Sequence, residues 1–200
     1  MEKLDTLQLV ALAAALGWAS GIRLYAVLFI VGALGYLGWF ELPAHLTVLS
    51  HPLVLAASGF MLFVEFFADK IPAFDLIWNA LHTFVRVPVA GLLAYQATRQ
   101  LSPGTQLLAT LLGAAVALAA HGGKTAARAA VTPSPEPLSN FTLSLGEDAL
   151  AIGLTWLATR HPYVAGTLAT IFVVIIVLLL RWVIRALRAL FRGAEQELAG

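Results

Sequence analysis

The chain alternates between long apolar runs and short polar or proline-containing joints. The apolar runs cover residues 7–38, 52–68, 76–97, 106–131, 143–157 and 162–187. None of them alternates apolar and polar positions over about 10 residues, as the strands of a membrane β-barrel do. Residues 162–180 carry no charge, and about 20 apolar residues are what a helix needs to cross a bilayer. The pattern predicts an all-α integral membrane protein with about six hydrophobic segments.

Composition supports the same class. Hydrophobic residues make up 60% of the 200 positions and charged residues only 12%, about half the usual share of a soluble domain. The chain has no cysteine, which excludes disulfides and thiolate metal sites, and its net charge of +1 gives no indication of a nucleic-acid partner. Residues 1–8 lack the basic head and small-residue cleavage site of a secretory signal.

The basic residues are unevenly placed. Four arginines follow directly on the last apolar run: Arg181, Arg185, Arg188 and Arg192. Because positively charged flanks stay on the cytoplasmic side, we expect the C-terminus of this multi-pass membrane protein to lie in the cytoplasm.

Two of the runs are interrupted by glycine between polar and basic residues. Residues 20–23 read SGIR and residues 121–124 read HGGK, and a basic-x-Pro joint follows in each half at 68–72 and 158–162. The sequence therefore predicts two repeated halves, 1–97 and 106–192, joined by a linker at 98–105 and followed by a cytoplasmic tail at 193–200. Each half would contain a helix broken at glycine and two further spans.

Two membrane arrangements fit this pattern. Three spans per half would invert the second half relative to the first and place Lys70 on the cytoplasmic side, and we favour this inverted repeat. The alternative treats each broken segment as a re-entrant hairpin, which leaves four true spans and places the joint at 69–70 outside. A bundle of 200 residues is thin, so a homo-oligomer also fits.

A helix broken inside a bilayer survives only where its free backbone groups are buried in protein or line a polar cavity. Arg23 and Lys124 would lie on the first turn after each break, where the helix dipole is already positive. A bound anion would compensate both charges, as at the midplane sites of repeat-built transporters. The alternative is a glycine kink with a basic side chain that reaches toward water.

Further polar residues share helix faces with the breaks. The candidate substrate-binding residues are Gly21, Arg23, His82, Arg86, His121, Gly122, Gly123, Lys124 and Arg128. The candidate ion-coupling residues are Glu65, Asp69, Asp75, Glu147 and Asp148. Charged groups inside a membrane cost at least ~2.5 kcal/mol each, so they pair with one another or serve a transport path. Those near segment ends, such as Asp69 and Glu147, could instead mark the membrane interface.

Five motifs together resemble a known family. They are GIRLY at 21–25, FFADKIP at 66–72, HTFVR at 82–86, SPEPLSN at 134–140 and SLGED at 144–148. They are similar to the bacterial membrane-protein family filed as domain of unknown function 4126, and the resemblance covers nearly the whole chain. It implies a polytopic inner-membrane protein and brings no substrate with it.

The sequence thus favours a small secondary transporter, or a flippase-like carrier, for an anionic solute or lipid head group, with membrane lipid around it and no cofactor or metal. One alternative is an integral-membrane enzyme that acts on a phosphorylated lipid, with His82 or His121 as general base. Another is a non-catalytic membrane assembly factor or partner subunit. No P-loop, HExxH or GxSxG motif is present, so an enzyme is the less favoured reading.

Overall fold

Helices account for nearly all of the backbone in the computed structural model, which describes residues 4–131 and 137–199. They are α1 (Thr6–Tyr36), the 3-10 helix η1 (Ala44–Ser50), α2 (Pro52–Ala68), α3 (Pro72–Ala97), α4 (Pro103–Val131), α5 (Pro137–Arg160) and α6 (Pro162–Ala199). The described ranges contain no β-strand, so the predicted all-α class is confirmed.

The helix starts follow local sequence signals. Asp5 caps α1 by a capping box, in which its side chain accepts from the backbone N–H of Gln8 and the Gln8 side chain accepts from that of Asp5. Each of the helices α2 to α6 begins with proline, whose fixed φ and missing N–H suit the first helical position. Proline also disfavours helix in the residue before it, so these positions separate consecutive helices.

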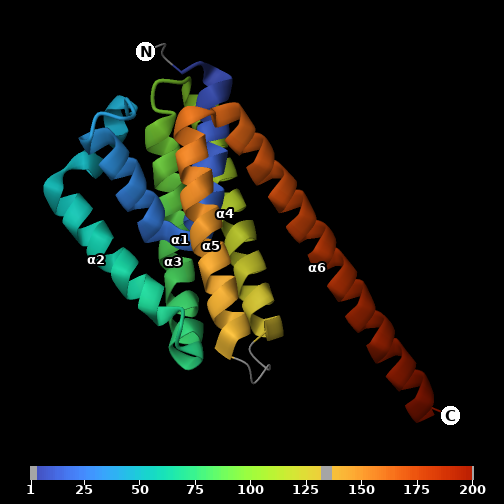
Figure 1. Cartoon of the computed structure of the whole chain (residues 1–200). Helices are drawn as coiled ribbons and strands as arrows, with labels where there is room; N and C mark the ends of the chain where they lie inside the picture. The colour runs from blue at the N-terminus through green and yellow to red at the C-terminus, as the bar shows by residue number, and fades with distance from the viewer. Residues whose placement is uncertain (1–3, 132–136, 200) are drawn as a thin grey trace.

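Helix α1 is bent inside the bundle. Arg23 has φ −143° and ψ 84°, which is not helical, and it divides α1 into arms at 6–22 and 24–36. Leu9 from the first arm and Phe40, which follows the second arm, line the same cavity. The two arms therefore begin and end at one end of the bundle, with the bend at Arg23 inside it (Figure 1).

Four helices are long and apolar enough to cross a membrane: Thr6–Tyr36, Ile77–Ala97, Pro103–Arg128 and Pro162–Ala186. A fifth results if η1 and α2, which are bent by 66° relative to each other, count as one span. Several apolar helices of this kind indicate a multi-pass membrane protein. Helix α5 does not belong to this set, because it carries Glu147 and Asp148 in its middle turns.

The second predicted break is wrong. Helix α4 runs without interruption from Pro103 to Val131, through the HGGK segment at 121–124. A glycine inside a helix costs only about 1 kcal/mol relative to alanine. The helical segments on both sides of HGGK are long enough to offset this cost. A Cβ added at Gly123 would lie 2.8 Å from Cδ1 of Ile176 in α6, so this glycine permits close packing, whereas Gly122 has no neighbour within 4 Å.

The first break is displaced from the predicted glycine by two residues. Gly21 itself is helical and buried, and a Cβ at this position would collide with the carbonyl oxygen of Ala117 in α4. One turn along the chain before it, a Cβ at Gly17 would lie 2.5 Å from the carbonyl oxygen of Gly113. These glycines let the first arm of α1 and α4 approach closely, as small residues do between membrane helices.

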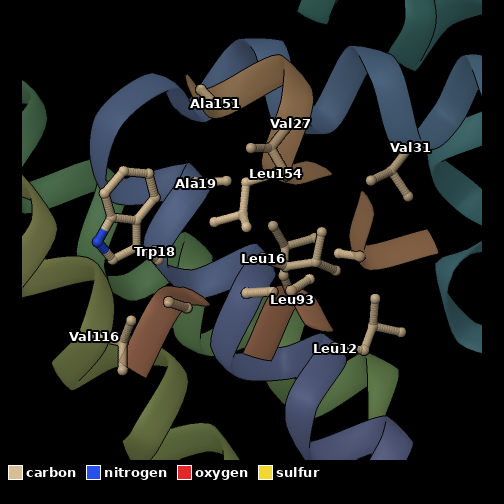
Figure 2. Close-up of a cluster of buried hydrophobic side chains, with 14 of the residues drawn as sticks. Leu12, Leu16, Trp18, Ala19, Val27, Val31, Leu93, Val116, Ala151 and Leu154 are labelled. Atoms are coloured by element: carbon tan, nitrogen blue, oxygen red, sulfur yellow. The ribbon is translucent and has the colours of Figure 1, made fainter. Parts of the chain in front are cut away.

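The apolar core surrounds the two arms of α1. Leu12, Leu16 and Val27 of α1 are almost fully buried. They pack with Leu93 of α3, Val116 of α4 and Leu154 of α5 (Figure 2). Because α3, α4 and α5 contribute to this cluster, they pack against both arms of α1.

Helix α6 lies at the outside of the bundle and diverges from the other helices toward the C-terminus (Figure 1). Its side chains Val174, Leu178 and Trp182 are exposed, as expected for a surface that faces lipid. The basic residues Arg181 and Arg185 are exposed as well, next to the end of the apolar part.

Candidate functional site

Six charged side chains from four parts of the chain meet at the bend of α1, and we call them the ionic cluster. They are Arg23 of α1, Asp69 directly after α2, Lys124 and Arg128 of α4, and Glu147 and Asp148 of α5. All of them belong to the residues predicted from the sequence as binding or coupling groups. The structure brings them together, although the chain separates Arg23 from Asp148 by more than a hundred positions.

Arg23 lies at the centre of the ionic cluster and is fully buried. Its Nη1 donates to Asp69, and its Nη2 donates to the side-chain oxygen of Ser144 at 3.0 Å and to the Ser144 carbonyl oxygen at 3.2 Å. Its Nη2 also lies 3.5 Å from Glu147, and its Nε lies 2.8 Å from Oδ1 of Asp148. The bend in α1 is what directs this guanidinium toward α2 and α5.

Lys124 contacts both a backbone carbonyl at the bend of α1 and two acidic side chains of the ionic cluster. Its Nζ lies 3.3 Å from the carbonyl oxygen of Ile22, which precedes the non-helical residue of α1. It also donates to Asp69 at 3.0 Å and lies 3.4 Å from Glu147. A carbonyl freed by a helix break in a membrane needs such a partner.

Arg128 completes the ionic cluster from the next turn of α4. It binds Glu147 through two parallel contacts, Nε to Oε1 at 3.0 Å and Nη2 to Oε2 at 2.7 Å, and its Nη1 donates to the Asp69 carbonyl oxygen at 2.9 Å. Two-point binding of this kind is the strongest geometry for an arginine and a carboxylate. Lys124 and Arg128 are four positions apart, so helical spacing places both on one face of α4.

The charges of the ionic cluster balance, with three basic and three acidic side chains. Removing charges from water costs several kcal/mol per ion unless they are paired and hydrogen-bonded. Each of Asp69 and Glu147 lies within 4 Å of three cations, Arg23, Lys124 and Arg128. The ionic cluster is therefore a packed network, in which acids from other helices hold the two cations that the sequence left without a nearby carboxylate.

A second buried ion pair joins α2 and α3. Arg86 donates from Nη2 to Oε1 of Glu65 at 2.5 Å, and both side chains are fully buried. The Nη1 of Arg86 donates to Oδ1 of Asn79 at 2.8 Å and lies 3.0 Å from Nδ1 of His121 on α4. We call these four residues the Arg86 network. Since His121 and Lys124 share a face of α4, the network adjoins the ionic cluster.

The protonation of His121 follows from its partners. Arginine only donates, so Nδ1 of His121 accepts from Arg86, and Nε2 then donates to Oγ1 of Thr83 at 2.7 Å. His82 is engaged similarly, with Nδ1 donating to the Trp78 carbonyl oxygen at 2.8 Å and Nε2 3.1 Å from the Tyr25 hydroxyl. Both ring nitrogens of each histidine therefore have a hydrogen-bond partner.

Lys70 lies in the joint between α2 and α3, beside the ionic cluster but outside it. Its Nζ donates to the Phe66 carbonyl oxygen at 2.9 Å and lies 3.0 Å from the centroid of the Phe66 ring. Partial burial lowers the pKa of Lys70 below its usual value, and the nearby Asp148 carboxylate opposes that shift. Lys70 therefore marks the point where the charged site approaches the end of the bundle.

Several polar atoms in the two networks have no hydrogen-bond partner within the described part of the chain. They are Oε2 of Glu65, Oδ1 of Asp69, Oδ2 of Asp148 and the Nε atoms of Arg23 and Arg86. Buried polar atoms without partners are uncommon in native proteins and call for an explanation. Three of the five are carboxylate oxygens, the groups that can take up a proton.

Not all predicted site residues reach the ionic cluster. Gly21 and Gly123 allow close packing of helices, and a Cβ added at Gly122 would meet no atom of another element within 4 Å. The side chain of Asp75 lies outside the residues that the structure describes. Sequence reasoning missed Ser144, which shares a helix face with Glu147 at a spacing of three.

No group of three metal-ligating side chains is found among the described residues. A cavity of about 460 Å³ lies away from the bend of α1, at the end of the bundle where the two arms of α1 begin and end. Its lining includes Trp39, Phe40, Gln100 and Arg160. None of the six residues of the ionic cluster lines this cavity.

Comparison with known proteins places the chain in a family. The family model described as Domain of unknown function (DUF4126) matches residues 10–182, which include both charged networks and the membrane helices. No curated protein and no solved structure matches the chain. The bend of α1, the ionic cluster and the Arg86 network all fall inside the matched range, and the chain belongs to the family DUF4126.

Proposed function

We propose that the protein is a small secondary transporter, or a flippase-like carrier, for an anionic solute or the anionic head group of a lipid. The observation that carries the proposal is the convergence of Arg23, Lys124 and Arg128 at the bend of α1. Two guanidinium groups and an ammonium group form a set that binds oxyanions well. Charged side chains buried in membrane proteins mark substrate and ion pathways.

The carboxylates of the ionic cluster act in this proposal as internal substitutes for the substrate. Asp69, Glu147 and Asp148 hold the three cations while no anion is bound. An entering anion competes for one of these donors, and the carboxylate that it displaces then binds the coupling cation. The bend at Arg23 supplies the moving part, because the backbone there lacks the continuous hydrogen bonds of a helix.

The Arg86 network supports a role in ion coupling. Glu65 is fully buried, and one of its oxygens has no hydrogen-bond partner among the described residues. Arg86 and His121 connect it to the helix face that carries Lys124. We assign ion coupling to Glu65 together with the acids of the ionic cluster, and we place Asp75 in this group from sequence alone.

The membrane arrangement is part of the proposal. We propose that α1 enters and leaves at one side as a bent hairpin and that α2 to α6 cross the membrane in turn, with the acids of α5 paired to basic side chains of the ionic cluster instead of facing lipid. We place the protein in a bacterial inner membrane, with the C-terminus in the cytoplasm because of Arg181, Arg185 and Arg188. An internal duplication, inverted or not, stays a prediction. It is supported by three long helices in each of the halves 1–97 and 106–192, whereas the continuity of α4 removes the duplicated break.

Transport by the reconstituted protein tests this function. Vesicles of phosphatidylethanolamine and phosphatidylglycerol containing the protein should take up radiolabelled dimethyl phosphate, or move fluorescent phosphatidylglycerol between leaflets, faster than protein-free vesicles. The variant with Arg23→Gln and Lys124→Gln should lose this activity because two of the three cations are gone. Arg99→Gln, an exposed arginine outside both networks, is the matched control.

Five outcomes separate the hypotheses. Uptake of the soluble probe identifies a solute carrier, and movement of the lipid alone identifies a flippase-like carrier. Wild-type rates in the double variant, with correct insertion shown by size-exclusion chromatography, contradict the anion site. Release of phosphate from a lipid pyrophosphate without transport would favour the enzyme, and neither activity would favour a partner subunit.

A further inference from the structure

We propose that the substrate displaces the Asp148 carboxylate from Arg23, and that Asp148 binds one proton for each singly charged anion carried. This inference rests on the proposed transport function and specifies its coupling ion, its stoichiometry and the residue responsible. It follows from how unequally the three acids of the ionic cluster are held.

Asp69 and Glu147 are each held by three cations. Asp69 contacts Arg23 and lies 3.0 Å from Lys124 and 3.5 Å from Arg128. Glu147 lies 2.7 Å from Arg128, 3.4 Å from Lys124 and 3.5 Å from Arg23. Releasing either acid would leave several buried cations without their partner at once.

Asp148 has one cationic partner within the described residues, Nε of Arg23 at 2.8 Å from Oδ1. The contact is close but not aligned as a hydrogen bond, since this Nε has no hydrogen-bond partner, and neither has Oδ2 of Asp148. Asp148 is also the most exposed of the three acids, with 16% of its side chain accessible against 0% for Asp69 and 8% for Glu147. It is therefore both the most weakly held acid and the one that water reaches first.

The charge balance determines what must accompany the anion. With three positive and three negative side chains among the described residues of the ionic cluster, a singly charged anion alone would leave one uncompensated negative charge in a site from which water is largely excluded. Protonation of Asp148 removes that charge and frees Nε of Arg23 to donate to the anion. The proton comes from the aqueous phase and forms an O–H bond on the carboxylate, so the transported unit is one anion and one proton.

A metal cation is a poorer candidate for the coupling ion. Hard cations take several oxygen ligands together. Among the residues that the structure describes, no three acidic or histidine side chains are grouped for this purpose, and the acids of the ionic cluster already contact basic groups. The charged groups that act on Asp148 are Arg23 of α1, Glu65 of α2, Lys70 of the joint and Glu147 of α5, with Lys124 and Arg128 of α4 behind Glu147. None of them supplies a free ligand set.

The substrate shares the chemistry of a phosphodiester, an oxyanion with one negative charge. A soluble phosphodiester and a phospholipid head group both offer it. Dimethyl phosphate serves as the soluble probe because it stays ionised without carrying a proton of its own. Phosphatidylglycerol serves as the lipid probe, and comparison of the two arms identifies the source.

The experiment counts protons. Vesicles that contain the protein and an internal pH dye are given external labelled dimethyl phosphate, or fluorescent phosphatidylglycerol in the outer leaflet, and the membrane potential is set with potassium and valinomycin. We expect about one proton to enter per anion, and a rate that does not respond to the potential. In Asp148→Asn, which keeps the shape of the neutral acid, the anion should move without a proton and respond to the potential. Glu41→Gln, an exposed acid outside both networks, is the control.

The outcomes distinguish the two proposals. Anion movement without protons in the wild-type protein overturns the coupling inference and leaves the transport function standing, as does a ratio near one in Asp148→Asn. If Asp148→Asn does not insert, Asp148→Ser provides the second neutral variant, and the wild-type ratio decides by itself. If neither probe moves, the transport function fails and the coupling inference with it.

Discussion

Arg23 and Asp69 are 46 positions apart in the chain, yet their side chains form an ion pair from which solvent is fully excluded. The pair joins the bend of α1 to the end of α2 and lies at the centre of the ionic cluster. Its burial predicts that both residues contribute to stability as well as to function.

Neutralising Asp69 should strongly destabilise the protein. Asp69→Asn leaves three buried cations with two acids, and removing one partner of a buried ion pair costs about 3–5 kcal/mol. We expect a clear fall in the unfolding temperature in detergent, measured by fluorescence-detected size exclusion. Glu41→Gln should leave that temperature unchanged, and an equal fall in both variants would contradict the argument.

The Glu65–Arg86 pair predicts a strong energetic coupling. Glu65→Gln leaves the Arg86 guanidinium without its acid, and Arg86→Met leaves the Glu65 carboxylate buried and unpaired, so each change alone should cost about 3–5 kcal/mol. The double variant should be more stable than the sum of the two, because no uncompensated charge remains. A double-mutant cycle of unfolding free energies measures the coupling, and additive effects would show that the pair is not linked.

The two glycine positions should respond oppositely to substitution. Gly21→Val places a side chain against the Ala117 carbonyl oxygen of α4, so we expect loss of the folded, monodisperse protein. Gly122→Ala meets no atom within 4 Å in the described structure and should be neutral or stabilise by up to about 1 kcal/mol, because alanine favours helix. Equal sensitivity at both positions would contradict the continuous α4.

The re-entrant path of α1 predicts which positions share a side. The chain has no cysteine, so single cysteines can be labelled without a background substitution. Glu41→Cys and Gln100→Cys lie at the cavity end and should react with a membrane-impermeant reagent from outside. Lys70→Cys and Arg188→Cys should react only after the membrane is opened. If Lys70→Cys reacts from outside together with Glu41→Cys, α2 does not cross the membrane.

The sequence by itself determined the all-helical class and most helix positions. The apolar run at 52–68 coincides with α2 (Pro52–Ala68), and the runs at 76–97 and 106–131 end where α3 and α4 end. These features are local, because hydrophobic length and the proline at the start of α2 to α6 depend only on neighbouring residues. The candidate site residues could be identified from the sequence for the same reason, because a charged residue inside an apolar run is recognised without knowing the fold.

Only the tertiary structure decided which of these residues meet, and where the chain bends. The segments SGIR and HGGK look alike in sequence, yet α1 bends at Arg23 while α4 continues through Gly122 and Gly123. A helix break is stable only where other elements satisfy its backbone, and Lys124 does this for the carbonyl of Ile22. That partner is 102 positions away, so no local pattern could reveal it.

The tertiary structure likewise decided which charged side chains pair. Sequence showed that Arg23 and Lys124 lack a nearby acid and predicted that acids from other spans, or an anion, would reach them. Packing of α1 against α2, α4 and α5 brings Asp69, Glu147 and Asp148 to them and makes the charges equal in number. Asp69 and Glu147 each contact three cations and Asp148 contacts one among the described residues, and these numbers are set by how the helices pack and not by the order of residues along any one of them.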